Sequence, residues 1–90
     1  MTEPWSAEAV GGGRYRFTNT FGGKLVMITL QPVGTTEVSV EGHILDDPHA
    51  VPAPVDAGDS FVATVRGPGV QITATDPSTM RHYHWSLDVS

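Results

Sequence analysis

Hydrophobic and polar residues alternate along several short segments of the chain. Residues 14–18 and 37–41 show this pattern, and so do three segments in the second half. Alternation with a period of two places each apolar set on one face of a β-strand. The predicted inward-facing sets are Tyr15 and Phe17; Val38 and Val40; Phe61, Ala63 and Val65; Val70, Ile72 and Ala74; and Tyr83, Trp85, Leu87 and Val89. Such clean alternation predicts antiparallel strands with one face in water.

Glycine and proline separate these segments at regular intervals. The chain has 90 residues, of which 10 are Gly and 7 are Pro, and β-branched residues dominate the stretches between them. Breaks spaced in this way, with no window that keeps a helical apolar stripe, are typical of an all-β sandwich or barrel. The length suits a single domain. We therefore predict one domain over residues 1–90, an antiparallel β-sandwich of six to seven strands.

One predicted strand, residues 24–30, is apolar on both faces. If Val26, Ile28 and Leu30 point into the core, Leu25 and Met27 point away from it. Two explanations are structural: the N-terminal segment covers the second face, or a β-bulge switches the faces. The functional alternative is an exposed apolar patch that binds a partner.

The sequence resembles a family of small domains through several loose motifs. These are residues 14–20 (RYRFTNT) followed by a glycine pair, residues 56–61 (DAGDSF) before an apolar strand, and a last strand that contains Trp85. In this pattern the chain is similar to small immunoglobulin-like sandwich domains of actinobacterial proteins. It departs from them at Ala57, where proline is commoner, and at His84 before the tryptophan. The resemblance implies an immunoglobulin-like sandwich and implies no activity.

Charge and composition remove several classes of function. Five Lys and Arg stand against ten Asp and Glu, which gives a net charge of −5, and cysteine is absent. A nucleic-acid partner is not expected because duplex binding needs a basic surface. No apolar run approaches the ~20 residues of a membrane helix, and the first residues lack a secretory signal, so we expect a cytoplasmic protein. Disulfides and thiolate metal sites are excluded.

The strongest chemical motif is the pair His82 and His84. Residues two apart on a strand share a face, and two imidazoles there suit Zn²⁺ or Cu²⁺. Further ligands would come from the segment 43–49, which contains His43, Asp46, Asp47 and His49. The simpler interpretation is a pair of solvent-facing imidazoles on an antiparallel sheet.

Four other features have structural explanations. Gly58-Asp59-Ser60 matches the start of an esterase signature, but no helix follows Ser60, and a turn that leads into a strand explains the residues better. Residues 11–13 (GGG) precede a strand rather than a phosphate-binding helix, which predicts a turn. Arg14 and Arg16 share an outward face, where charges keep a strand edge soluble. Residues 46–59, with three prolines, predict a long loop or at best an edge strand.

The sequence thus favours a non-catalytic binding or assembly module that needs no cofactor. Its partner would be another protein or a second copy of the chain. The surfaces expected to carry binding are Leu25 with Met27, or the face of His82 and His84. The alternative is a metal-binding protein or metal-dependent enzyme that uses the two histidines with residues 43–49.

Overall fold

The computed structural model of the chain describes residues 3–41, 51 and 54–88, and these form seven β-strands. Each strand begins near a predicted glycine or proline break, and every strand contains β-branched or aromatic residues. The strands are β1 (Trp5–Gly11), β2 (Arg14–Asn19), β3 (Val26–Val33), β4 (Glu37–Val40), β5 (Ser60–Arg66), β6 (Gly69–Asp76) and β7 (Arg81–Asp88). Among the described residues no helix is long and apolar enough to cross a membrane.

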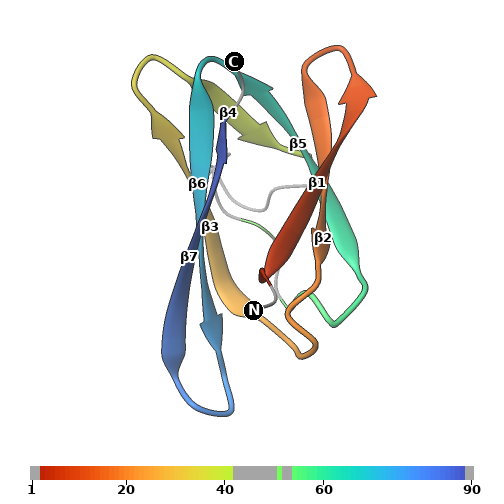
Figure 1. Ribbon diagram of the computed structural model, residues 1–90, viewed down its shortest axis with the longest axis vertical. Coiled ribbons are helices and arrows are strands. Elements are labelled where there is room, and N and C mark those ends of the chain that lie inside the picture. Colours follow the sequence, from red (N-terminus) through yellow and green to blue (C-terminus); the bar gives the residue numbers. More distant parts are fainter. Residues whose placement is uncertain (1–2, 42–50, 52–53, 89–90) are drawn as a thin grey trace.

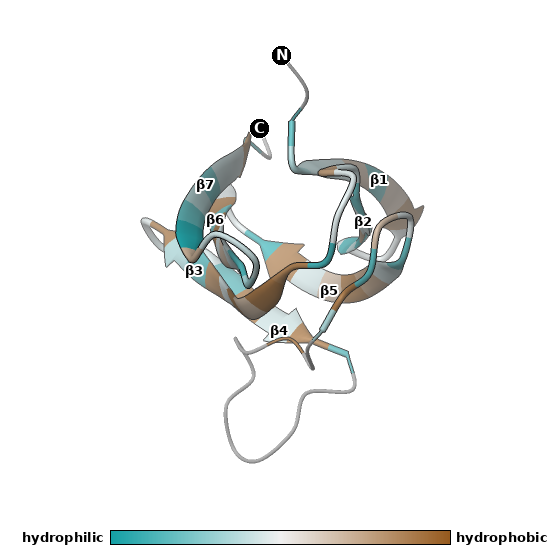
Figure 2. Cartoon of the chain, turned by 90° about the horizontal axis from the view of Figure 1, so that it is seen from below, coloured by the Kyte–Doolittle hydropathy of each residue, from teal (hydrophilic) through white to brown (hydrophobic). Residues whose placement is uncertain are grey.

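The strands form two antiparallel sheets that face one another (Figure 1). One sheet has four strands in the order β1-β2-β5-β4, and the other has three in the order β3-β6-β7. Viewed from below, the two sheets are separate layers, and β7 lies at the margin of its sheet (Figure 2). The predicted all-β sandwich is therefore confirmed, with seven strands.

The core lies between the sheets and contains many of the predicted inward-facing side chains, together with Trp5, Leu25, Val51 and Val55. Val38, Val40, Val70, Ile72 and Ala74 are all buried. The inward side chains of β7 are only partly buried, although they pack against the core. Val89 lies outside the described residues.

Four aromatic rings connect the first strand to the last across this core. Trp5 of β1 meets Phe61 with ring centroids 5.4 Å apart, and Phe61 stacks on Phe17 at 5.2 Å. Phe17 then meets Trp85 of β7 edge-to-face at 6.3 Å. Aromatic pairs at such distances contribute beyond their burial. The contact between Phe17 and Trp85 therefore joins the two sheets.

A β-bulge in β3 resolves the segment that is apolar on both faces. The register between β3 and β6 shifts between Val26 and Thr29, and Met27 adopts a left-handed φ of 52°. Leu25 is consequently 0% exposed, whereas Met27 is 67% exposed. The hypothesis that Leu25 and Met27 share an exposed face is wrong, because the bulge turns Leu25 into the core.

The hairpin between β6 and β7 is closed by Asp76. Its Oδ1 accepts hydrogen bonds from the hydroxyl (2.8 Å) and the backbone amide (2.9 Å) of Ser78. These bonds lower the pKa of the Asp76 carboxyl, because they stabilise its charged form. The hydrogen bonds of the turn therefore favour the ionised form of Asp76.

Candidate functional site

The two histidines of β7 lie on the outer face of the three-stranded sheet. Both are exposed, and they stand opposite Thr75 and Thr73 of β6. The Nδ1 atom of His82 lies 2.8 Å from the hydroxyl of Thr75, within hydrogen-bonding distance. The alternation of β7 thus presents both imidazoles to solvent, as predicted.

A metal site at these histidines would need further ligands. Within residues 3–41, 51 and 54–88, no group of three His, Asp or Glu side chains is placed to hold a metal ion. The proposed additional ligands, His43, Asp46, Asp47 and His49, lie outside the described residues.

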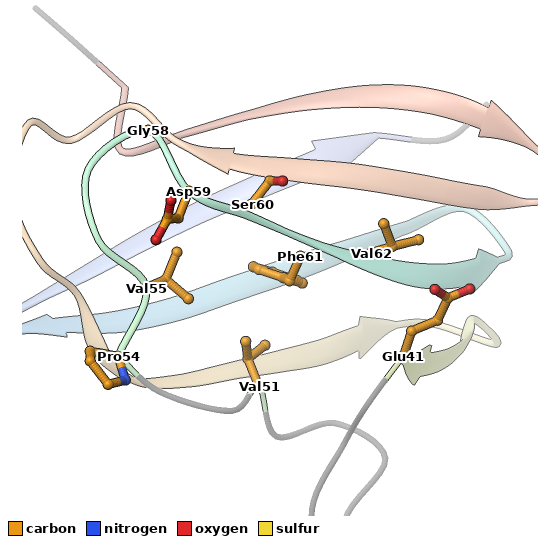
Figure 3. A pocket seen from close by; sticks show the side chains of 9 residues that line it. All are labelled: Glu41, Val51, Pro54, Val55, Gly58, Asp59, Ser60, Phe61 and Val62. Atoms are coloured by element: carbon orange, nitrogen blue, oxygen red, sulfur yellow. The ribbon is translucent and has the colours of Figure 1, made fainter.

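A hollow of about 720 Å³ lies beside the start of β5. The side chains of Val51, Val55 and Phe61 point toward one another in its apolar part, and Glu41 and Asp59 lie at its sides (Figure 3). Glu41 is paired with Arg14, whose Nε lies 2.7 Å from the carboxylate. The hollow is therefore lined by polar and apolar groups in similar measure, and its acidic rim is partly neutralised.

Asn19 holds the segment that forms one wall of this hollow. Its side-chain amide donates to the carbonyls of Gly23 (2.8 Å) and Val55 (3.0 Å), and its Oδ1 accepts from the amide of Phe21 (2.8 Å). Its backbone carbonyl accepts from Gly58 (2.9 Å). Asn19 is 2% exposed, so this one side chain fixes two backbone segments inside the protein, the turn at 21–23 and the segment at Val55.

Ser60 lies in the hollow without the partners of a nucleophile. It is the first residue of β5, directly after the turn at Gly58 with φ 85°, which is the structural interpretation made from the sequence. The described residues that line the hollow include no histidine to act as a base. The described structure places Ser60 at the beginning of a strand.

The glycine run forms a turn, and the two arginines form exposed ion pairs. Gly12 and Gly13, both with positive φ, connect β1 to β2 as a hairpin turn. Arg14 pairs with Glu41 as described above, and Arg16 lies 3.9 Å from Glu8. These exposed pairs contribute little to stability. They place opposite charges along the outer face of the four-stranded sheet.

Four strands lie at sheet edges, and three of them carry features that discourage pairing with another chain. β1 contains a register shift between Ala9 and Gly11. β3 contains the bulge described above and also Pro32, which cannot donate to a ladder. β4 is only four residues long. Bulges, proline and short length are the devices that natural edge strands use against unwanted pairing.

β7 carries none of these devices. All eight residues, Arg81–Asp88, pair in continuous register with β6, with no bulge and no proline. Its charged residues, Arg81 and Asp88, stand only at its two ends. Among the described residues no strand pairs with the other side of β7. This side offers a straight ladder of backbone donors and acceptors.

No known protein family matches this sequence, and no characterised protein or solved structure matches it.

The sequence indicated His82 and His84 because of their imidazole side chains. It did not show that their strand lies at the edge of a sheet. Part of the evidence for an unprotected edge strand is present in the sequence, because residues 81–88 contain no proline, lysine or glutamate. What the sequence did not show is which strands lie at the sheet edges. Of the two residues in the other predicted surface, only Met27 is exposed.

Proposed function

We propose that this chain is an immunoglobulin-like, non-catalytic binding or assembly module that takes up a partner strand along the free edge of β7. The continuous, unprotected ladder of β7 carries the proposal. An extended segment that adds to such an edge gains backbone hydrogen bonds along its length, and side chains on alternate positions supply specificity.

The strand order supports an immunoglobulin-like architecture. Constant-type immunoglobulin domains place their first, second, fifth and fourth strands in one sheet and their third, sixth and seventh in the other. The same order is found here. The tryptophans differ from that pattern, since they lie on β1 and β7 rather than on β3.

The side chains along β7 give the edge two different faces. His82 and His84 are exposed on the outer face and suit polar or acidic side chains of the added strand. Tyr83, Trp85 and Leu87 are partly buried on the inner face, where an added strand would extend the apolar core. The preferred partner strand therefore alternates polar and apolar residues in step with β7.

Site-specific photo-crosslinking in the native cells tests this proposal. A benzophenone amino acid at Ser86 of β7 is compared with the same group at Gln31, an exposed position on β3, the opposite edge strand of the same sheet. We expect a covalent adduct from position 86 and little or none from position 31. No adduct at position 86, or equal adducts at both positions, would contradict the proposal.

A further inference from the structure

We propose that the strand added at the edge of β7 is β7 of a second copy of this chain, antiparallel and related by a twofold axis at Trp85. This inference rests on the proposed function, since it names the partner of the same edge. It follows from the sequence of β7, because in one register two antiparallel copies of the strand place complementary side chains opposite one another.

Side-chain direction limits the registers that two copies can adopt. In an antiparallel pair, residues that stand directly opposite one another point to the same face. A twofold axis perpendicular to the sheet keeps the inner face of both copies on the same side, so inward residues must oppose inward residues. The residue at the axis therefore opposes its own copy, and Trp85 and His84 are the two central candidates in the eight-residue strand.

The register centred on Trp85 gives a matched partner to each residue from His82 to Asp88. On either side of the axis, Tyr83 of one copy stands opposite Leu87 of the other. This aromatic–aliphatic cross-strand pair extends the apolar inner face. On the outer face, His84 opposes Ser86, and His82 opposes the carboxylate of Asp88. An imidazole and a carboxylate directly opposite one another form a hydrogen bond or an ion pair.

The neighbouring register centred on His84 is poorer. It would place His84 opposite its own copy and Ser86 opposite His82. It would also leave the carboxylate of Asp88 without the imidazole of His82. The register at Trp85 therefore gains two imidazole–carboxylate pairs that the register at His84 lacks. Complementarity of charge and polarity thus selects the register at Trp85.

The burial of β7 agrees with a second copy on its free side. Tyr83, Trp85 and Leu87 are all partly buried, whereas Val70, Ile72 and Ala74 of the adjacent strand are fully buried. Pairing through one strand from each copy would make a continuous six-stranded sheet. Such an isologous contact closes on itself and yields a dimer rather than a filament. The contact is small, so we expect reversible association.

Analytical ultracentrifugation of the full chain provides the first test. We expect the mass to rise from the 9.6 kDa of one chain toward twice that value as concentration increases to about 1 mM, a range that captures weak contacts. In the proposed register, the double variant His84→Lys/Ser86→Lys places lysines directly opposite one another, and we expect it to remain monomeric. The control Gln31→Lys/Val33→Lys adds the same charge to exposed positions of β3 and should dimerise like the wild type.

A charge exchange tests the register itself. We expect His82→Glu to weaken the dimer at least 10-fold, because it places a glutamate opposite Asp88. Asp88→Lys should weaken it as well, because it removes the carboxylate that His82 faces. The double variant His82→Glu/Asp88→Lys should restore association, since a glutamate of one copy then faces a lysine of the other. Failure of the double variant to recover would overturn the proposed register.

The two proposals fail in different ways. A wild type that stays monomeric throughout, while the crosslinker at Ser86 captures a different protein, overturns the second copy as partner and supports strand addition at β7. A monomeric wild type with no adduct overturns both. Dimerisation that persists in the His84→Lys/Ser86→Lys variant also overturns the inference, because the contact then lies elsewhere.

Discussion

Replacing Asn19 removes a buried side chain that connects the turn at 21–23 to the segment at Val55. In Asn19→Ala, the carbonyls of Gly23 and Val55 and the amide of Phe21 each lose a hydrogen-bond partner. A net contribution of about 1 kcal/mol for each bond gives a loss of about 3 kcal/mol. A domain of this size has a total stability of roughly 5–13 kcal/mol, so the loss is a large fraction of it.

Urea denaturation followed by tryptophan fluorescence measures this loss. With a denaturant slope of roughly 1–1.5 kcal/mol/M for a small domain, we expect the midpoint to fall by roughly 2–3 M. Thr20→Ala is the control, since it removes a single exposed hydrogen bond to the carbonyl of Glu3 and should cost about 0.5 kcal/mol or less. A loss below about 0.5 kcal/mol in Asn19→Ala would refute the reasoning.

The isosteric variant Asn19→Asp separates hydrogen bonding from packing. Its carboxylate oxygen would face two carbonyl oxygens where the amide group donates to both, so burial should raise the folded pKa of the new carboxyl. A raised folded pKa means that the penalty is absent below the unfolded value of about 3.9 and grows as the pH rises through the folded pKa. We expect Asn19→Asp to be much less stable than the wild type at pH 7 and to approach it near pH 4. An equal deficit at both values would contradict this explanation.

Three further predictions concern the backbone and the β6–β7 turn. Met27→Gly should raise the stability by up to about 1 kcal/mol, because Met27 has a left-handed φ that glycine adopts without strain. Val33→Gly, at another exposed position of β3, should lower the stability by a similar amount, and thermal melts compare the two variants. Gly67→Ala should cost at least about 2 kcal/mol in urea denaturation, because at φ 147° its Cβ would lie 2.5 Å from the Cα of Thr36. The lowered pKa of Asp76 predicts stability that is present above about pH 4 and is lost as the pH falls through the folded pKa. In Asp76→Asn this part of the acid dependence of the melting temperature should disappear.

The strands were predictable because their signal is local. Alternation at Val38 and Val40, or along residues 81–88, depends only on the period of the pleat, and each predicted strand with this pattern is present. Residues 24–30 were the exception. A bulge changes the phase of the alternation by one residue, so a strictly regular strand assigns Leu25 to the wrong face.

The candidate site was less predictable because it depends on contacts between distant segments. The hydrogen bonds of Asn19 reach Val55, 36 residues away, and no local pattern indicates them. The free edge of β7 depends on which strands pair, and the sequence does not order the strands within a sheet. His82 and His84 were selected for their possible chemistry, whereas their position on an unprotected edge supports a proposal about binding.

The four-ring contact between Trp5 and Trp85 has a consequence for synthesis of the chain on the ribosome. Phe17 gains its contact with Trp85 only after Trp85, which lies far along the chain, has been translated. Contacts between distant segments form slowly because a long loop must close before they are made. The nascent chain therefore exposes part of its aromatic core until β7 has emerged, and a ribosome stalled before Trp85 would hold a domain unable to complete its packing.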